Sequence, residues 1–325
     1  MPATTECRRA AFYLAAEEYV AAQLPEDNYL FSWQLKETVV MGRNQVAHQE
    51  VNLDFCQKEG IDVVRRKSGG GAIFADRNNI MWSLITGGGA VEPLFEEYAS
   101  HMARALNELG ANVTVSGRND IVLKGGGKVC GNAFFHLPNR NIVHGTMLYD
   151  SNLQMMERAL RPNVGKLESK GVKSVRSRVA LLKDFLPFGV DELRKRLRPL
   201  LCDRNISLTE TDVKAIEQIE KSYYEVSYIY GQPTKSDFSL VQHFEGCGTI
   251  HLAFKLRGTL IEEVTLSGDY FEINNAQRAF ERAFKGKPFT PAALIGAVTE
   301  RHPEQSIRSL TEKALTEWLT REING

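Results

Sequence analysis

Short β-type segments crowd the first half of the chain and restrict its fold more than any other feature. Seven of them, rich in β-branched or aromatic residues, lie at Tyr29–Leu35, Thr38–Gly42, Asp62–Arg66, Ile80–Ile85, Val113–Ser116, Asp120–Leu123 and Ile142–Tyr149. One strong helical pattern lies among them at Glu92–Leu109, and Gly110 follows in the position that ends a helix. Because strands outnumber helices, a strictly alternating βαβ layout is disfavoured. The pattern predicts an α+β fold with a mixed or antiparallel sheet flanked by helices.

After Asp150 the chain becomes helical and then changes character again. Helical spacing covers Asn152–Leu160, Glu192–Leu201 and Thr209–Tyr223, and Thr209 with Asp212 resembles a capping box. The polar stretch Gly231–Ser239 is typical of a linker. Beyond it we expect a hairpin that turns at Arg257–Gly258 and a helix that begins at Thr290–Pro291. The 325 residues fit two domains, which we place at 1–238 and, as a small α/β domain, at 239–325.

Composition narrows the class of protein. Forty basic residues balance forty acidic ones, so the basic excess typical of nucleic-acid-binding proteins is absent. Arg8 and Arg9 precede an apolar run, as in a signal peptide, but Glu17 and Glu18 end the run early, which predicts an amphipathic first helix. No window approaches the ~18 apolar residues of a transmembrane helix. The cysteines lack a CxxC pair, which predicts free thiols in a reducing cytoplasm; they are Cys7, Cys56, Cys130, Cys202 and Cys247.

A glycine run after two arginines is the first candidate site. The stretch RRKSGGGA covers Arg65–Ala72 and lies between two β-type segments. Glycines leave the backbone N–H groups open to a ligand, and such groups can form an anion-binding nest. Arg66 can add a fork of charged donors. The alternative is a flexible glycine hairpin, but three glycines directly after an Arg-Arg pair favour a binding role.

A second glycine run precedes a lysine. The stretch SGRNDIVLKGGGKVCGNAFFH contains Asn119, Asp120 and Lys128. It is no Walker A loop, because that motif needs a glycine where the chain has Val122 and a serine or threonine where it has Val129. A lone lysine after glycines is more often a solvated turn residue. The nearby first glycine run favours a cation that binds a ligand.

Two further stretches carry polar residues in unusual places. His144-Gly145-Thr146 interrupts an apolar strand, where a lone histidine is most often structural. The stretch KGVKSVRSRV at Lys170–Val179 holds four cations in ten residues. It can be a solvated loop or a flap on the phosphate side of a ligand.

Together these motifs resemble one family, lipoate–protein ligase A. The family pattern has Arg-Arg-x-Ser-Gly-Gly-Gly-Ala, Gly-Arg-Asn-Asp, Gly-Lys-x-Ser-Gly-Asn-Ala, His-Gly-Thr and Ser-Val-Arg-Ser-Arg-Val. This chain reads RRKSGGGA, GRND, GKVCGNA, HGT and SVRSRV in the same order. The resemblance is specific from Arg65 to Val179 and weaker over the rest of the chain.

The resemblance implies a two-step reaction with ATP, Mg²⁺ and lipoate. The enzyme first forms lipoyl-AMP and then transfers the lipoyl group to a lysine of a lipoyl domain, in 2-oxoacid dehydrogenase E2 subunits or glycine-cleavage H protein. Residues 1–238 are then the catalytic domain and 239–325 an accessory domain of a cytoplasmic monomer. Lys128 is the implied catalytic residue and Asp120 the implied Mg²⁺ ligand. The implied nucleotide site has Arg66, Gly71, Ala72, Ile73, Phe74, Asn119, Asp120, Lys173 and Arg176, and the implied lipoate site has Lys128, Gly70, Gly131, Ala133, His144 and Thr146.

Three departures from the family pattern leave alternatives open. Ala75 stands where the family often has histidine, Asn78 replaces a glycine, and Cys130 replaces a serine. An ATP-independent octanoyl or lipoyl transferase needs a thiol of depressed pKa, for which Cys130 is the candidate in the motif region. A non-catalytic protein that binds lipoate or an acyl-adenylate is the other alternative. The Gly-Arg-Gly-Arg signature of biotin–protein ligases is absent from the sequence.

Overall fold

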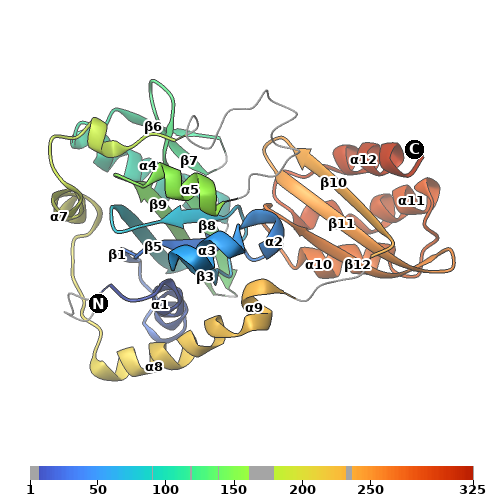
Figure 1. Ribbon diagram of the computed structural model, residues 1–325, viewed down its shortest axis with the longest axis horizontal. Helices are drawn as coiled ribbons and strands as arrows, with labels where there is room; N and C mark the ends of the chain where they lie inside the picture. Colours follow the sequence, from blue (N-terminus) through green and yellow to red (C-terminus); the bar gives the residue numbers. More distant parts are fainter. Residues whose placement is uncertain are drawn as a thin grey trace. The chain divides into compact units, whose positions relative to one another are not determined.

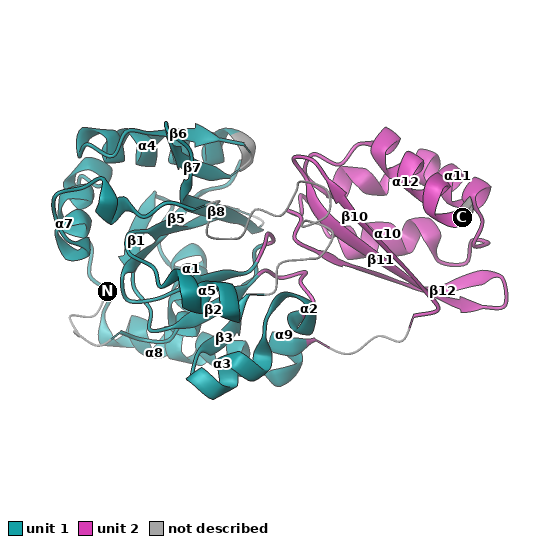
Figure 2. Ribbon diagram, turned by 45° about the horizontal axis from the view of Figure 1, so that its top comes forward, with its two compact units in different colours: residues 1–41, 47–68, 72–230 teal, residues 42–46, 69–71, 231–325 magenta. Residues whose placement is uncertain are grey.

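A computed structural model of the chain describes residues 7–89, 91–117, 119–137, 139–160, 179–231 and 236–324 (Figure 1). Contacts divide the chain into two compact units (Figure 2). Unit 1 comprises residues up to 41, Ala47–Ser68 and Ala72–Tyr230, and unit 2 comprises Gly42–Val46, Gly69–Gly71 and the residues from Gly231 onward. The assignment of a catalytic domain to residues 1–238 and an accessory domain to 239–325 stays a prediction, because compactness assigns no activity.

A six-stranded antiparallel sheet forms the centre of unit 1 among the described residues. Its order is β1 (Tyr29–Trp33), β5 (Asn79–Gly87), β9 (Arg140–Leu148), β8 (Lys128–Leu137), β7 (Asp120–Leu123) and β6 (Val113–Ser116). This sheet confirms the predicted α+β class. The sequence did not predict β8, because glycine, asparagine and cysteine at its start weaken the β pattern.

A small mixed sheet lies in the same unit. Strand β2 (Thr38–Met41) pairs in parallel with β3 (Asp62–Arg65) and antiparallel with β4 (Ile73–Ala75), which the sequence did not predict. Apolar side chains of β2 pack against the short helices of this region. These helices are α2 (Ala47–Glu50), α3 (Leu53–Glu59), α5 (Leu153–Ala159) and α9 (Val226–Tyr230).

Helix α1 (Ala10–Gln23) is buried on almost every side. Its apolar residues pack with Trp33 and Met81 of the large sheet and with Ile216 of α8 (Glu210–Glu220). The prediction of an amphipathic first helix was therefore wrong, because α8 covers the side of α1 that the sheet leaves open (Figure 1). As a consequence Glu17, in the middle of α1, is a buried carboxylate.

Helix α4 (Val91–Glu108) covers the opposite face of the large sheet from α1. Phe95 of α4 contacts Phe134, which pairs with Val143. The residue before Val143, Ile142, packs on Val20 of α1. Neighbouring residues of a strand project to opposite faces, so α1 and α4 lie on opposite faces of the sheet. Helix α7 (Val190–Leu201) and the 3₁₀ turns η2 (Leu182–Asp184) and η3 (Lys221–Tyr224) complete the described part of unit 1.

Unit 2 is a three-stranded antiparallel sheet with helices packed on it. The strands are β10 (Phe238–Phe244), β11 (Gly248–Arg257) and β12 (Leu260–Gly268), and the helical elements are α10 (Ala276–Phe284), α11 (Pro291–Arg301), η4 (Pro303–Ser306) and α12 (Glu312–Asn324). The predicted hairpin is confirmed, with Gly258 in the left-handed region at its turn. The predicted helix start is confirmed too, since the Thr290 hydroxyl accepts the Ala293 N–H at 3.4 Å.

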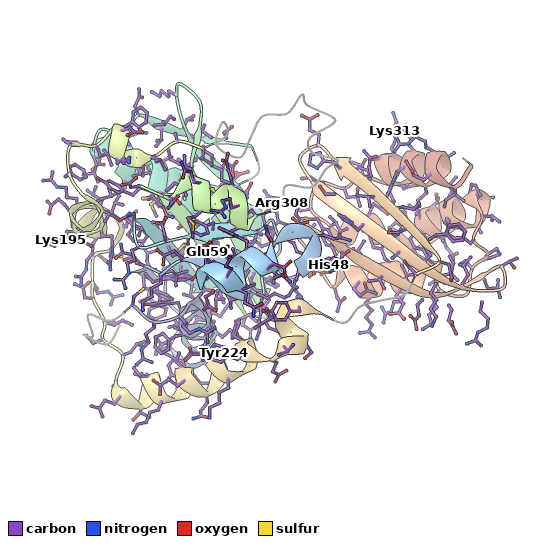
Figure 3. The ribbon with its side chains drawn as sticks, viewed as in Figure 1. His48, Glu59, Lys195, Tyr224, Arg308 and Lys313 are labelled. Carbon is purple, nitrogen blue, oxygen red and sulfur yellow. The ribbon has the colours of Figure 1, made fainter. Side chains whose placement is uncertain are left out.

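The exposed faces of both units carry charged side chains. Lys195 on α7 and Lys313 on α12 are examples (Figure 3). Among the described helices, none is long and apolar enough to cross a membrane.

The capping box at the start of α8 yields a stability prediction. The Thr209 hydroxyl accepts the Asp212 N–H at 3.2 Å, and Asp212 accepts the Thr209 N–H at 2.6 Å. Loss of an N-cap costs about 1 kcal/mol, which is about fivefold in a local opening equilibrium. We expect Thr209→Ala to accelerate amide hydrogen exchange across α8 by about that factor. Thr211→Ala makes the same chemical change inside the helix, and equal acceleration in both variants would contradict the cap.

Candidate active site

Strand register places several of the predicted site residues on one face of the large sheet. Gly131 pairs with Thr146 on one side and with Asp120 on the other, and Ala133 pairs with His144. Directly opposed residues of antiparallel strands project to the same face. This is the face that α1 covers, because His144 contacts the Glu17 side chain of that helix. The sheet therefore brings together residues from three strands that the sequence predicted from separate motifs.

The Lys128 side chain lies over this face, where it forms an ion pair with Asp120 and occupies the space that Gly131 leaves open. Its Nζ lies 2.7 Å from Oδ1 of Asp120, and each of the two side chains is 33% exposed. A Cβ atom on Gly131 would lie 2.5 Å from both Cε and Nζ of Lys128. Gly131 thus leaves the space through which the lysine side chain crosses its own strand. The pair is a cation and an anion that remain open to a ligand.

The far end of the basic stretch returns to Lys128. Val179 forms a parallel bridge with Lys128, and the Ala180 N–H donates to the Lys128 carbonyl at 2.9 Å. The cations predicted to act from this stretch, Lys173 and Arg176, lie outside the described residues, and their roles stay predictions.

A buried polar network lies on the same face. Nε2 of His144 is 2.7 Å from Oγ of Ser68, and its Nδ1 is 3.1 Å from both carboxylate oxygens of Glu17. The Arg66 Nε donates to the same Ser68 Oγ at 2.8 Å, and its Nη1 donates to the Val40 carbonyl at 3.1 Å. All four side chains of the network are buried.

The network continues through a serine into the protein core. Ser83 donates to a Glu17 oxygen at 2.5 Å, and the Trp33 Nε1 donates to Ser83 at 2.9 Å. One proton arrangement satisfies the chain: the imidazole donates from Nδ1 to Glu17, and its Nε2 accepts from the Ser68 hydroxyl.

The two adjacent arginines have different partners. Burial lowers the pKa of Arg66 to about 10, and the Glu17 carboxylate opposes this shift, so the guanidinium stays charged at neutral pH. Arg65 donates instead to the carbonyls of Tyr228 and Ile229 at the end of α9, at 2.7 to 3.0 Å. Arg65 is therefore a residue of the scaffold, whereas Arg66 belongs to the buried network.

Comparison with known proteins places the chain in a family. The family model described as the lipoyl protein ligase A/B catalytic domain matches residues 9–199, and that of the bacterial lipoate protein ligase C-terminus matches residues 234–319. The chain belongs to the lipoate–protein ligase family. Lipoate–protein ligase 1 of Staphylococcus aureus is 35% identical over 81% of this chain and 82% of its own length. Lipoate-protein ligase LplJ of Bacillus subtilis is 34% identical over 86% and 88%.

A solved structure of a lipoate protein ligase has a similar fold. The bi-partite lipoate protein ligase of Thermoplasma acidophilum, studied with its E2 lipoyl domain, is 25% identical and superposes with a TM-score of 0.62. The match covers 70% of this chain and 94% of that one.

In this ligase Cys130 is a buried scaffold residue. Its thiol donates to Oδ1 of Asn132 at 3.4 Å, and burial raises its pKa to about 12. Asn132 and Asn119 exchange hydrogen bonds between side chain and backbone at 2.8 and 3.0 Å. Gly145 makes room for the Asn132 amide, since a Cβ there would lie 2.1 Å from Oδ1. A protonated, buried thiol is no nucleophile, which argues against the transferase alternative.

The first glycine run is grouped with unit 2. The Gly70 N–H donates to the Tyr270 carbonyl at 3.1 Å, and a Cβ on Gly69 would lie 2.4 Å from that oxygen. A ligand that uses the Gly70 N–H must therefore replace this bond. Of the other predicted nucleotide residues, Ile73 and Phe74 lie in β4, with the Phe74 side chain buried. The binding roles of Gly70, Gly71, Ala72, Ile73 and Phe74 stay predictions.

Two of the departures from the family pattern, Ala75 and Asn78, lie at the end of β4 and in the turn after it. Ala75 is fully buried beside β2, and Asp76 accepts the N–H groups of Asn78 at 3.0 Å and Asn152 at 2.8 Å. Burial raises the pKa of Asp76, and these hydrogen bonds oppose the shift. The aspartate thus anchors the turn after β4 to the start of α5.

Sequence reasoning did not single out Glu17, Ser83 or Asn132. Glu17 offered a usable signal, because a carboxylate follows directly on an apolar helical run. Ser83 and Asn132 offered none, since small polar residues are common in strands and turns.

Gly131 provides a test of the lysine position. We expect Gly131→Ala to push the Lys128 ammonium aside and to slow adenylation about 100-fold, the loss typical of a misplaced catalytic group. Gly125→Ala is the matched control, because no atom lies within 4 Å of a Cβ at that position. Pyrophosphate release with lipoate measures both. Equal rates in the two variants would show that Lys128 does not need the space.

Cys130 provides a test between ligase and transferase. We expect Cys130→Ser to keep full ATP-dependent ligation, because burial keeps the thiol protonated at neutral pH and its hydrogen bond goes to Asn132. Cys202→Ser, at a half-buried thiol, is the control. A loss of acyl transfer in Cys130→Ser alone would restore the transferase.

Proposed function

We propose that this chain activates lipoate with ATP to lipoyl-AMP and transfers the lipoyl group to a specific lysine of lipoyl domains. One observation carries the proposal: the Lys128–Asp120 pair lies on the same sheet face as the buried Arg66–Ser68–His144–Glu17 network. A partly exposed cation beside a buried, hydrogen-bonded polar network suits a substrate with an anionic head and an apolar tail. The family relationship supports the same reaction.

In the first step a lipoate carboxylate oxygen attacks the α-phosphorus of ATP. The new phosphorus–oxygen bond gives the mixed anhydride, and the bond to the leaving pyrophosphate breaks. Negative charge builds on the phosphoryl oxygens, where the Lys128 ammonium can stabilise it. Asp120 holds that ammonium in place beforehand, so little reorganisation is needed when the substrates bind.

In the second step the ε-amine of the acceptor lysine attacks the acyl carbon. The carbonyl oxygen becomes an oxyanion, the amine loses a proton, and AMP leaves with the electron pair of the anhydride bond. Lys128 again faces the developing charge, on the acyl oxygen and on the departing phosphate. In this proposal Lys128 serves both steps.

The lipoate seat is proposed from side-chain size and polarity. Gly131, Ala133 and Thr146 are small residues on the face where Lys128 projects. His144 lies on this face with both ring nitrogens in contact with hydrogen-bond partners, Ser68 and Glu17. Such a wall accepts an apolar tail without leaving a buried charge unpaired.

Mg²⁺ fits the residues present. Mg²⁺ in ATP enzymes is commonly held by one or two carboxylates together with substrate phosphates, and Asp120 offers one partly exposed carboxylate. When bound, the ion neutralises phosphate charge. Asp120 would hold the ion while it remains close to Lys128, and Asn119 keeps the turn before Asp120 fixed through Asn132.

The acceptors are proposed to be lipoyl domains of 2-oxoacid dehydrogenase E2 subunits, glycine-cleavage H protein, or both. The Thermoplasma acidophilum ligase, studied with its E2 lipoyl domain, supports the first group. The five free cysteines support a reducing cytoplasm as the compartment, and a monomer is the form we propose.

Lys128→Ala tests the proposal directly. We expect it to lower lipoate-dependent pyrophosphate release about 10²- to 10³-fold, because a preorganised charge donor is lost. Lys124→Ala removes an exposed lysine of the same hairpin and should retain wild-type turnover. The second readout is the mass of a purified apo-lipoyl domain, which should increase by one lipoyl group with the wild type and with Lys124→Ala. A wild-type protein that binds lipoate without releasing pyrophosphate would leave the binding-protein alternative.

A further inference from the structure

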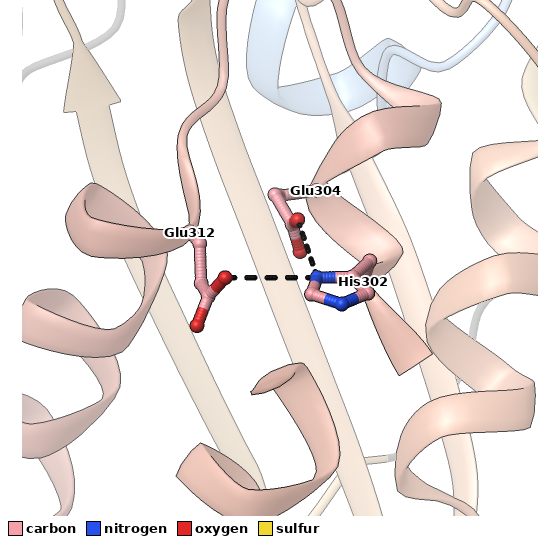
Figure 4. Close-up of side chains that lie close together, drawn as sticks. All are labelled: His302, Glu304 and Glu312. Carbon is pink, nitrogen blue, oxygen red and sulfur yellow. Dashed lines mark ion pairs between the residues drawn. The ribbon is translucent and has the colours of Figure 1, made fainter. Parts of the chain in front are cut away.

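Unit 2 contains a cluster of three potential metal ligands, His302, Glu304 and Glu312 (Figure 4). Nδ1 of His302 is 3.3 Å from Oε1 of Glu304 and 3.6 Å from Oε2 of Glu312. One ligand atom from each residue lies within 4.8 Å of the other two. Within the described part of the chain no other group of three such residues meets this geometry.

Glu304 is the unusual member of the cluster. Glu304 is 4% exposed, and its Oε2 is buried without a hydrogen-bond partner among the described residues. A buried carboxylate oxygen without a partner is costly, because it has lost water and gained nothing in return. A positive ion at this place would stabilise the buried Glu304 carboxylate. The carboxylate of an exposed surface ion pair has water as a partner and needs no such ion.

The backbone fixes the three residues relative to one another. His302 ends α11 in the left-handed region with φ of 47°, and Pro303 begins η4 immediately after it. The Ser306 carbonyl at the end of η4 accepts the Ile273 N–H at 2.9 Å. Glu312 is the first residue of α12, and its Oε1 accepts a hydrogen bond from Thr299 at 3.1 Å. The ligands therefore come from three consecutive elements joined by short turns.

We infer that His302, Glu304 and Glu312 bind a divalent transition-metal ion of the Zn²⁺ type, with water completing the coordination. A tetrahedral ion with bonds of about 2.0–2.1 Å separates its ligand atoms by about 3.3–3.5 Å, close to both distances from Nδ1. The imidazole favours Zn²⁺ and related ions over Mg²⁺ and Ca²⁺, which take oxygen ligands. The Thr299 hydroxyl orients Glu312 from outside the ligand set, as partners of metal ligands commonly do.

Such an ion would join the end of α11, η4 and the start of α12. The site holds no group of the lipoylation chemistry, so its role is to stabilise unit 2. The alternative is an ion pair in which a protonated His302 lies between two carboxylates. That arrangement satisfies His302 but leaves Oε2 of Glu304 without a partner, whereas a metal ion that Glu304 binds through both carboxylate oxygens would engage Oε2 as well.

The experiment uses the full-length, tag-free chain, stripped with a chelator and then equilibrated with Zn²⁺ or Co²⁺ in the absence of ATP. Bound metal is measured by mass spectrometry after dialysis, affinity by competition with a chromophoric chelator, and ligand type by the visible absorption of Co²⁺. The variants are His302→Asn, since asparagine tolerates a positive φ, and Glu304→Gln, which keeps the shape of the side chain. Glu300→Gln removes an exposed carboxylate of α11 and is the matched control.

We expect one metal equivalent in the wild type and in Glu300→Gln, with affinity at least about 10-fold weaker in His302→Asn and Glu304→Gln. The Co²⁺ spectrum should show nitrogen and oxygen ligation without a thiolate charge-transfer band. A wild type that retains no metal would overturn the inference. Equal retention in all four proteins, or a thiolate band from the free cysteines, would overturn it as well.

Discussion

The buried carboxylate of Glu17 is the interaction on which the candidate site depends. It compensates the buried Arg66 guanidinium and fixes the His144 tautomer, and His144 in turn orients Ser68. A buried charge without a partner costs several kcal/mol, so the network requires every member. This explains why α1 lies in the interior of unit 1. A helix that brings a carboxylate into the core must itself be surrounded, and α8 closes the side that the sheet leaves open.

The second pair of charges serves a different purpose. Lys128 and Asp120 are each one-third exposed, so water screens their attraction and a ligand can compete for either group. The buried network is rigid and closed, whereas the exposed pair can exchange partners. Gly131 links the two, because it lies beside Thr146 on the sheet face and leaves the space that Lys128 crosses. The proposed adenylation uses both features, a fixed polar network and a partly exposed charge for the phosphate.

The sequence predicted the strands that β-branched residues mark, but it did not predict β8, whose glycine, asparagine and cysteine have other tasks. It predicted Lys128 and His144 from local motifs, and the structure brings both to one sheet face. It could not predict that Glu17 meets His144, because 127 residues separate them and only the fold joins them. It also treated Cys130 as a possible nucleophile, whereas its reactivity depends on burial, which a linear pattern does not reveal.

The adjacent arginines show why a motif can mislead about its own residues. Read as a sequence, Arg65 and Arg66 form one cationic patch in front of the glycines. Successive residues at the end of a strand project to opposite sides, so Arg65 reaches the carbonyls of Tyr228 and Ile229, and Arg66 reaches Ser68. Both guanidinium groups are buried, and the role of Arg66 in nucleotide binding stays a prediction. Lys128, from another strand and another motif, is the partly exposed cation that we predict to act on the nucleotide, whereas the two arginines are held by buried partners.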